Sequence, residues 1–599
     1  MSSIPERLTA LRKEMATGQI DAYLIFGTDP HMSEYVAERW RDRAWISGFT
    51  GSAGTFVCTS EKAGLWTDSR YYVQAAGELE GSGITLFRQG EAHVPGICEW
   101  LGQELPQEAV VGADGWTISA ELYRSFQQQL GVYGLELHAS EDLIDRIWDE
   151  RPGLPGEDIY QHDLRYAGRS RQEKLEQLQQ HLQELKADYQ LLSALSDIAW
   201  LFNLRGGDIK YNPLFLSYAL IGKEGVHLCV DRGKLSEELS SLLEEEGIKI
   251  APYQKVEELI QSTIRPDERV LYDPSTVSYA LAEQVRWYAR PVEKNDITTE
   301  MKAIKSSVEI EGIRNAMVKD GVAMVQFLYW LRHSWERGRL NEVSVGDALP
   351  QFRSRQPGFM GESFHPIVGF RDHGAVIHYS ANASTAYELD GDGLLLIDSG
   401  AHYLDGTTDI TRTVCLGEAT AQQREDYTNV LKSHINLAMA RFPQGTRGVQ
   451  LETFAKYSMW NRGLNYAHGT GHGVGCFLNV HEGPQSISSR LVDAVLKPGM
   501  FNSNEPGLYR ENAYGIRIEN LILTGEQFET PFGRFYGFET LTLCPLEPQL
   551  IEPALLNAEQ LQWVNDYHHK VYTLLSPELK AEERRWLEQQ TAVISYAGS

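Results

Sequence analysis

The sequence predicts an α+β protein of several domains, in which two similar α/β domains precede a larger domain and a helical extension. Its 599 residues exceed the usual size of one domain several times, so we expect two to four domains with separate cores. Short apolar runs alternate with helical patterns through the first 300 residues. From about residue 355 to 545, glycines and short β-branched runs dominate instead.

Residues 1–150 form the first predicted domain, an α/β unit. Strands are expected at residues 21–26, 55–58 and 64–68, because each is a short apolar run bounded by polar or turn-forming residues. The stretch 151–156 contains two prolines and two glycines, which favour irregular backbone. We therefore place a linker there.

Residues 157–300 form the second predicted domain, which resembles the first. Leu175, Leu178, Leu182 and Leu185 recur at helical spacing, which is typical of ordinary core packing. Two motifs of the first domain also recur: Ala44-Trp45 before Gly48 resembles Ala199-Trp200 before Gly206, and Leu65-Trp-Thr-Asp68 resembles Leu228-Cys-Val-Asp231. Similar lengths of chain separate the two copies, which predicts a duplicated fold. A chance match is the alternative.

Residues 301–545 form the third predicted domain, and residues 546–599 extend it with helices. Its opening helix is indicated by apolar residues at helical spacing between Ile310 and Leu331. In the extension, Asn557 and Gln560 have the spacing of a capping box before another helix. We expect His568 and His569 of that helix to be exposed to solvent.

Composition and charge limit the kinds of partner that the protein is expected to bind. A formal charge of −27 and an isoelectric point near 5.1 argue against binding to nucleic acid or anionic lipid. The first residues lack the order of a signal peptide, and no apolar run approaches a membrane span. The six cysteines include no C-x-x-C pair. We therefore expect a soluble cytoplasmic protein with reduced cysteines and no membrane or nucleic-acid partner.

The stretch His468-Gly-Thr-Gly-His472-Gly-Val-Gly, followed by His481, gathers three imidazoles among glycines. Glycines allow a tight loop that brings the imidazoles close together. A phosphate-binding loop is disfavoured because G-x-x-x-x-G-K-[ST] is absent, and the zincin motif lacks its second histidine.

Four carboxylates lie in apolar, strand-like contexts around this loop. Asp398 ends one run and Asp409 begins the segment expected to pair with it as a hairpin, while Glu505 and Glu519 lie downstream. A buried carboxylate is costly unless it is paired or holds a cation. Taken singly, each Asp is explained by a structural hydrogen bond. Because side chains alternate along a strand, Arg517 and Glu519 are expected on one face, where a salt bridge would explain them.

Considered together, the five residues indicate a site for two divalent metal ions. Two Asp and two Glu supply the four negative charges that balance two such ions, and one His completes a donor set suited to manganese, cobalt or zinc. Two ions about 3.5 to 4 Å apart can deprotonate a shared water and polarise a carbonyl oxygen. The pattern therefore predicts metal-assisted amide hydrolysis.

The chain resembles the three-domain cytosolic Xaa-Pro aminopeptidases (aminopeptidase P) of the pita-bread metallopeptidase family. The resemblance covers nearly the whole length, and its motifs include residues 47–55, 65–72 and 199–206, the glycine-histidine loop, residues 504–507 and residues 515–520. It implies two creatinase N-terminal-like α/β domains before a pita-bread catalytic domain. One departure is Leu508, where relatives commonly carry tyrosine, and we expect at most an altered pocket shape.

The resemblance also implies roles for individual residues. The metal ligands would be Asp398, Asp409, His472, Glu505 and Glu519, with manganese the expected metal and zinc or cobalt the alternatives. Glu505 would also be the general base for the water that bridges the two ions. His378, His468 and His481 would orient substrate and stabilise the oxyanion, and Arg517 would support the ligands. From the residues alone, His468 as a brace for its loop and His378 as a core histidine remain alternatives.

The expected activity is release of the first residue from peptides with proline in second position, by a protein that forms a homodimer. A prolidase-like dipeptidase is the nearest alternative, and a non-catalytic peptide-binding protein or a metal-free amidinohydrolase are further ones. The family covers its cleft partly with the N-terminal domain, so Trp66, Arg70 and the Asp42-Arg43 pair are candidate rim residues. Packing within their own domain is the alternative.

Overall fold

The computed structural model describes residues 2–223, 225–338 and 340–596. Its contacts divide the chain into two compact units, which are described separately below. The first unit contains the residues up to His162 together with Arg169–Thr299, and the second contains Asp163–Gly168 together with Glu300–Ser599.

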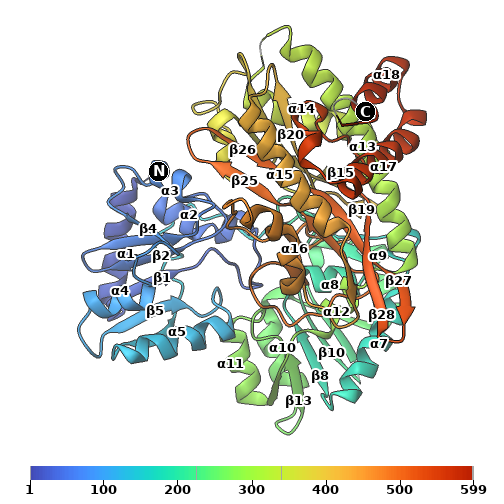
Figure 1. Ribbon diagram of the computed structural model, residues 1–599. Coiled ribbons are helices and arrows are strands. Elements are labelled where there is room, and N and C mark those ends of the chain that lie inside the picture. The colour runs from blue at the N-terminus through green and yellow to red at the C-terminus, as the bar shows by residue number, and fades with distance from the viewer. Residues whose placement is uncertain (1, 224, 339, 597–599) are drawn as a thin grey trace. The chain divides into compact units, whose positions relative to one another are not determined.

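The first unit opens with a six-stranded sheet in the order β4-β3-β2-β1-β5-β6 (Figure 1). The strands are β1 (Ala22–Ile25), β2 (Thr55–Thr59), β3 (Ala63–Thr67), β4 (Thr85–Arg88), β5 (Val110–Asp114) and β6 (Glu136–Ser140). Helices α1 (Ile4–Thr17), α2 (Asp42–Ser47), α3 (Tyr72–Glu78), α4 (Ile97–Glu104) and α5 (Ala120–Val132) accompany it. Side chains of β1 alternate: Tyr23 and Ile25 join the core under α1, whereas Ala22 and Leu24 join the core under α4 and α5. The three predicted strands are confirmed.

The second sheet of this unit repeats the first, with the order β12-β11-β10-β8-β13-β14. Its strands are β8 (Tyr189–Leu192), β10 (Tyr218–Gly222), β11 (Gly225–Cys229), β12 (Ile248–Ala251), β13 (Arg269–Tyr272) and β14 (Arg290–Glu293). Its helices are α7 (Arg171–Glu184), α8 (Leu195–Leu201), α9 (Glu237–Glu245), α10 (Val256–Thr263) and α11 (Tyr279–Tyr288), and β7 (Tyr160–Gln161) pairs with β9 (Leu204–Arg205). In both sheets the parallel and antiparallel pairings follow the same sequence. Since the motifs at Leu65 and Leu228 fall on the matching strands β3 and β11, the predicted duplication is confirmed.

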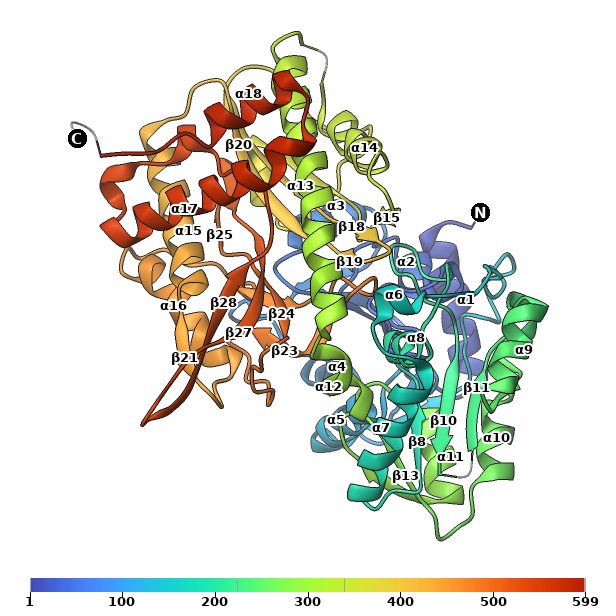
Figure 2. The ribbon, with the colours of Figure 1, turned by 90° about the vertical axis from the view of Figure 1, so that its right-hand side faces the viewer.

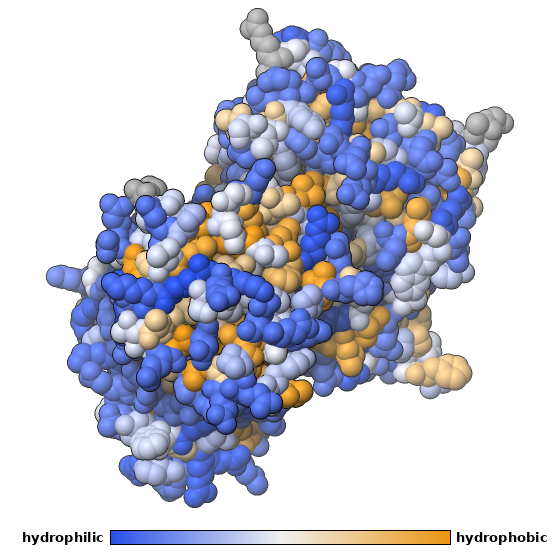
Figure 3. Space-filling view, turned by 90° about the vertical axis from the view of Figure 1, so that its left-hand side faces the viewer, coloured by the Kyte–Doolittle hydropathy of each residue, from blue (hydrophilic) through white to orange (hydrophobic). Residues whose placement is uncertain are grey.

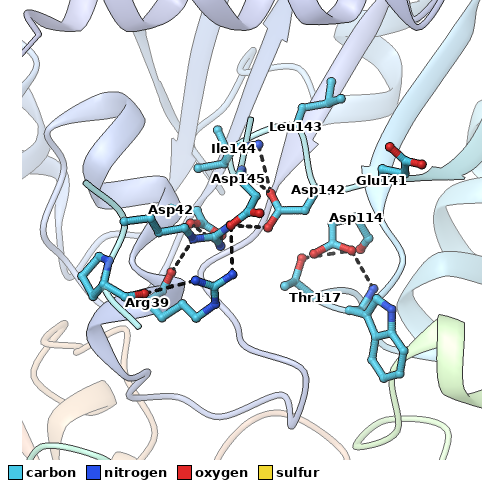
Figure 4. Close-up of polar contacts among 12 residues, drawn as sticks. Arg39, Asp42, Asp114, Thr117, Glu141, Asp142, Leu143, Ile144 and Asp145 are labelled. Atoms are coloured by element: carbon cyan, nitrogen blue, oxygen red, sulfur yellow. Dashed lines mark hydrogen bonds and ion pairs between the residues drawn. The ribbon is translucent and has the colours of Figure 1, made fainter. Parts of the chain in front are cut away.

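Most of the candidate rim residues pack inside the first unit. Trp66 is 1% exposed, stacks on Phe87 with 4.0 Å between ring centroids, and donates its indole N–H to the carbonyl of Pro95. Both oxygens of Asp42 accept from the Arg151 guanidinium at 2.9 Å (Figure 4). Arg43 is buried and donates to backbone carbonyls of residues 51–54. The packing alternative therefore holds for these three residues.

Arg70 differs from them because its side chain is 31% exposed. It forms two hydrogen bonds to Asp68, at 2.9 and 2.7 Å. Its position leaves the guanidinium partly open to solvent.

The second unit combines long helices with several small sheets (Figure 2). Its helices are α6 (Leu164–Ala167), α13 (Ser307–Trp335), α14 (Glu342–Arg353), α15 (Ala421–Ala438), α16 (Gly448–Trp460), α17 (Ala558–Leu575) and α18 (Ala581–Gln590); α12 (Ile297–Ala303) precedes α13. The sheets have the orders β15-β18-β19, β16-β17-β20, β21-β28-β27-β24-β22-β23 and β25-β26. Their strands are β15 (Phe359–Glu362), β16 (Ile367–Phe370), β17 (Gly393–Ser399), β18 (Ala401–Tyr403), β19 (Gly406–Thr407), β20 (Ile410–Leu416), β21 (Arg441–Pro443), β22 (Gly471–Gly473), β23 (Glu482–Ile487), β24 (Phe501–Asn504), β25 (Gly507–Arg510), β26 (Tyr514–Arg517), β27 (Asn520–Thr530) and β28 (Gly533–Thr540).

Helix α13 is the amphipathic helix that the sequence predicts, and it lies between two cores. Ser306 and Glu309 form a capping box at its start. Phe327 and Leu331 pack against α14 and the sheet of β16, β17 and β20, whereas Val322 and Val325 pack with α15 and α17.

The short helix α6 belongs to this unit although it precedes the second sheet in the chain. Gly168 ends α6 with φ +70°, and a Cβ there would lie 2.7 Å from Ser306 Oγ and 2.8 Å from Val308 Cβ. The end of α6 therefore fits closely against the start of α13.

In the C-terminal extension two predictions are confirmed and one is wrong. The capping box of Asn557 and Gln560 begins α17, and His569 is exposed. His568, by contrast, is completely buried, and its Nε2 accepts the backbone N–H of Leu546 at 3.2 Å. Burial, followed by the nearby charge of Arg412, lowers the pKa of His568 to about 4. The expectation that His568 is exposed is therefore wrong, because its face of α17 packs onto the chain that follows β28.

Figure 3 shows a face on which hydrophilic residues surround patches of hydrophobic ones. Among the described residues, every helix is too short or too polar to cross a membrane.

Candidate metal centre

Two of the predicted carboxylates lie on one hairpin. Strands β17 and β20 pair antiparallel, with Asp398 opposite Thr411, and Asp409 directly precedes β20. Along β17, Leu395 and Ile397 face the core that contains α14, so Asp398 faces the other side of the sheet. The predicted strand and its hairpin partner are confirmed.

The other ligand candidates come from the larger sheet and its neighbour. Glu505 follows β24 directly, and its N–H donates to the carbonyl of Thr470 at 2.8 Å, beside the glycine-histidine loop. His472 lies on β22, which pairs with both β23 and β24. The fold thus brings together the glycine-histidine loop and strands β22, β23 and β24. This arrangement places His472 beside Glu505.

Glu519 departs from the local prediction. The sequence suggests one strand through residues 515–520, but β26 ends at Arg517 and β27 begins at Asn520. Glu519 occupies the break, and its N–H donates to the carbonyl of Thr411 at 3.1 Å. This backbone bond ties Glu519 to the β17–β20 hairpin, so the alternation expected of a continuous strand does not apply at this residue.

The side chains converge at a partly buried site, where His472 and Glu505 retain 21% and 19% of their side-chain exposure. The Nε2 atom of His472 lies 3.5 Å from Asp409 Oδ2 and 3.4 Å from Glu505 Oε1. One ligand atom each from Asp409, His472 and Glu519 lie within 4.8 Å of one another. The Nδ1 atom of His472 lies 2.9 Å from the carbonyl of Gly473, and a proton on Nδ1 would leave Nε2 unprotonated toward the carboxylates.

Electrostatics at this site favour a bound cation. Burial raises the pKa of Glu505 to about 7, with His472 opposing the rise and Asp409 adding to it. Burial, followed by the nearby carboxylates, raises the pKa of Glu519 well above its ordinary value. Burial also raises the pKa of Asp398, against the effect of Arg517. Carboxylates that repel one another in this way are stabilised in their charged form by positive ions.

One unsatisfied atom supports the same conclusion. Asp398 Oδ1 is buried and has no hydrogen-bond partner among the described residues. Buried acceptors of this kind are uncommon unless an ion or water satisfies them. The donor set, oxygen-rich with one imidazole, fits divalent cations of the manganese, cobalt and zinc type.

Arg517 is buried and joins three groups of the site. Its Nη2 donates to Asp398 Oδ2 at 2.6 Å, its Nη1 donates to the hydroxyl of Tyr509 at 2.8 Å, and its Nε donates to Thr411 Oγ1 at 3.2 Å. The alternation argument had suggested a salt bridge between Arg517 and Glu519. In the structure Arg517 forms its salt bridge with Asp398 instead.

The histidines differ in their surroundings. The ring of His481 lies 4.4 Å from that of His472, nearly perpendicular to it. His468 Nε2 lies 2.8 Å from the Tyr509 hydroxyl, and its Nδ1 lies 2.8 Å from the carbonyl of Gly469. Since Arg517 can only donate to Tyr509, the tyrosine keeps its own proton available for His468. The contacts of His468 agree with the loop-bracing alternative as well as with a place near substrate.

His378 follows the short 3₁₀ helix η4 (Arg371–Ala375). This helix lies against β26: a Cβ on Gly515 would lie 1.7 Å from the carbonyl oxygen of Gly374. His378 is only half-buried, so a fully buried core position does not describe it.

The structure adds Thr411, which the sequence analysis missed, and places Leu508 in the core. Thr411 donates to Glu519 Oε2 at 2.8 Å and accepts from Arg517, and its place two residues after Asp409 was the available signal. Leu508 is 4% exposed and packs in the core with Ile516, so it lies away from the polar side chains. Tyr509, not Leu508, contacts Arg517.

Comparison with known families divides the chain into four matches. Residues 7–147 and 150–309 each match the creatinase/prolidase N-terminal domain, residues 311–526 match metallopeptidase family M24, and residues 534–594 match the C-terminal region of that peptidase family. The prediction of two creatinase N-terminal-like domains before a pita-bread catalytic domain is confirmed.

Relatives match this chain over nearly its whole length. Aminopeptidase P2 of Arabidopsis thaliana is 39% identical over 629 residues, which cover 98% of this chain and 88% of the relative. A probable Xaa-Pro aminopeptidase P of Botryotinia fuckeliana is 39% identical over 603 residues, covering 98% and 92%. The structure of an X-prolyl aminopeptidase from Caenorhabditis elegans, described as a cytosolic enzyme with a di-nuclear active site, is 33% identical, with a TM-score of 0.94 and coverage of 99% and 100%. The chain therefore belongs to the Xaa-Pro aminopeptidase P family, within metallopeptidase family M24.

Proposed function

We propose that this protein removes the first residue from peptides in which proline is second, by metal-assisted hydrolysis of the Xaa-Pro bond. The observation that carries the proposal is the cluster of three buried carboxylates and the half-buried Glu505 around His472 Nε2, which lies within 3.5 Å of two of the four. The family to which the chain belongs supports the same activity.

Asp398, Asp409, His472, Glu505 and Glu519 would hold two divalent cations, with manganese expected and zinc or cobalt as alternatives. Bound there, such ions acidify water and polarise a carbonyl oxygen. Thr411 and Arg517 orient the ligands by donating to Glu519 and Asp398.

The remaining steps belong to the side chains. Glu505 accepts a proton from the attacking water and transfers it to the proline nitrogen, which must be protonated to leave. His378 and His481 orient the peptide and donate to the oxygen on which negative charge develops. His468, held by Tyr509, is proposed to act beside them.

Proline in second position suits this chemistry. The Xaa-Pro bond is a tertiary amide without an N–H, so an enzyme that grips the scissile N–H handles it poorly. A site that acts on the carbonyl and on the nitrogen lone pair does not require that hydrogen.

We also propose a cytoplasmic homodimer. All six cysteines lie in the described part of the chain, are buried and form no disulfide, which suits a reducing compartment. Phe454, Tyr457 and Trp460 project from α16 with 44%, 62% and 54% of their surfaces exposed. Large aromatic side chains of this kind are enriched where protein copies meet. Sedimentation velocity of wild type and Tyr457→Arg tests the dimer, and a wild-type monomer would contradict it.

The activity is tested with metal-reconstituted protein and three peptides: an Xaa-Pro dipeptide, an Xaa-Pro-Xaa tripeptide and an Xaa-Ala-Xaa control. Release of the first residue from the tripeptide, with the control left intact, is the expected result. Cleavage confined to the dipeptide would favour a prolidase-like enzyme. Cleavage of the control as fast as the tripeptide would remove the proline assignment, and binding without cleavage would favour the non-catalytic alternative.

A further inference from the structure

Glu342, the first residue of α14, has a completely buried carboxylate that holds both ends of the segment 370–387. Its Oε1 accepts the backbone N–H of Phe370 at 2.7 Å, and its Oε2 accepts that of Tyr387 at 2.8 Å. A buried carboxylate without donors is costly, so these hydrogen bonds favour one conformation of the segment strongly.

Two side chains within the segment, those of His373 and Tyr379, also contact the Glu342 carboxylate. His373 Nδ1 lies 2.9 Å from both oxygens of Glu342, and the hydroxyl of Tyr379 donates to Oε2 at 2.9 Å. The ring of His373 stacks on Tyr387 with 3.6 Å between centroids and lies 4.3 Å from Tyr379. His378 lies between these contacts in the chain, directly before Tyr379.

The segment has little regular structure of its own. After η4, residues 376–387 belong to no helix or strand. Without a strand or helix to fix His378, its backbone position depends on tertiary contacts of the segment, which include the hydrogen bonds to Glu342.

The anchored segment lies at the metal centre. It begins at the end of β16, where Ile367 pairs with Asp398, and Gly374 packs against Gly515, two residues before Arg517. A shift of the segment would therefore move His378 relative to the carboxylate cluster.

We propose that Glu342, acting through His373 and Tyr379, is the positioning residue that fixes His378 for the peptidase reaction; this inference rests on the proposed function. Glu342 touches neither peptide nor metal. It keeps the His378 imidazole where it meets the developing oxyanion, so its loss lowers kcat more than it raises KM.

The sharpest test is the removal of one hydroxyl. Tyr379→Phe deletes a hydrogen bond to Glu342, and Tyr403→Phe deletes a matched one, because the Tyr403 hydroxyl donates to the buried carboxylate of Asp320 at 3.1 Å. Since a small misplacement of a catalytic group costs up to about a hundredfold, we expect kcat of Tyr379→Phe to fall by about tenfold with KM changed less than about twofold. Tyr403→Phe keeps the wild-type kcat.

A double-mutant cycle separates positioning from general damage. In a His378→Ala background, Tyr379→Phe and Glu342→Gln should cause no further loss of kcat, because their effect passes through His378. The rate at which diethyl pyrocarbonate modifies His378, read by peptide mass mapping, should change in Tyr379→Phe and stay unchanged in Tyr403→Phe.

Different results would overturn different claims. Wild-type kcat in both Tyr379→Phe and Glu342→Gln, or losses that multiply with that of His378→Ala, would overturn the positioning role while leaving the peptidase intact. A wild-type protein that leaves the tripeptide uncleaved would overturn the proposed function, and the inference with it.

Discussion

Arg517 donates to Asp398 across 2.6 Å, and this bond joins β26 to β17 at the centre of the carboxylate cluster. The side chains of Arg517 and Asp398 are 2% and 11% exposed. A buried arginine beside one of several carboxylates offsets part of their mutual repulsion, although the other oxygen of Asp398 remains free to accept a cation.

Replacement of Arg517 should weaken metal binding. In Arg517→Met, Asp398 loses its charged partner and its fixed orientation, so metal affinity and kcat should each fall by about 10- to 100-fold. Isothermal titration with manganese measures the affinity. Arg510→Met is the control, because Arg510 lies on β25, the strand that pairs with β26, but donates to Asp426 of α15 instead of to a ligand candidate. Equal losses in both variants would show that the effect is structural.

Replacement of Asp409 should reduce the amount of metal bound at the candidate metal centre. Asp409→Asn removes one negative charge and one ligand atom, so bound metal per chain should fall below that of wild type and kcat should fall by more than about a hundredfold. Elemental analysis of the purified protein measures the metal. Asp405→Asn, four residues earlier and paired with Lys319, should retain both properties. Unimpaired activity in Asp409→Asn would refute the metal mechanism.

The metal-free protein should lose stability as pH rises through neutrality. The pKa of Glu505 is raised to about 7 in the folded state, so folding favours its protonated form. The stabilisation is complete below the unfolded pKa near 4.5 and is lost as pH rises through about 7. Thermal melts in chelator at pH 5.5 and 8 should show the lower Tm at pH 8.

Added divalent metal should reverse this trend, because the ions bind the deprotonated carboxylates. The rise in Tm on adding manganese should therefore be larger at pH 8 than at pH 5.5. Calcium at the same concentration controls for ionic strength. A metal-free Tm that is higher at pH 8 would contradict the assignment of buried, repelling carboxylates.

Trp66 should matter for stability rather than for substrate. Trp66→Ala removes a side chain that is 1% exposed and stacked on Phe87, which typically costs about 3–5 kcal/mol. Urea denaturation followed by circular dichroism measures the loss. Arg70→Ala, at a partly exposed position, should cost about 1 kcal/mol or less. An unchanged unfolding transition in Trp66→Ala would contradict the core position.

The parts of the fold that depend on local pattern were predictable. The strands around Tyr23 and Phe56, the helix ending near Leu331 and the capping box at Asn557 each depend on neighbours within a few residues. The hairpin that brings Asp398 and Asp409 together was also predictable, because both strands carry their own signal. The roles of the site residues stay predictions.

What the sequence analysis did not predict has one common physical cause. Each of these residues interacts with a partner that is distant in the sequence. Glu519 lies between two strands instead of within one, because its N–H donates to the carbonyl of Thr411. His568 is buried because its face of α17 packs onto the chain near Leu546. Glu342 also depends on distant partners, because its four donors lie 28 to 45 residues later.

The place of α6 has a consequence for the synthesis of the chain. Residues 163–168 leave the ribosome before the whole second sheet, yet the surface that Gly168 fits is built by Ser306 and Val308. Residues 163–168 therefore cannot make their contacts with the start of α13 until α13 has been translated. A fragment that starts at residue 300 would lack it altogether, so the catalytic unit cannot be separated from the rest of the protein by one cut.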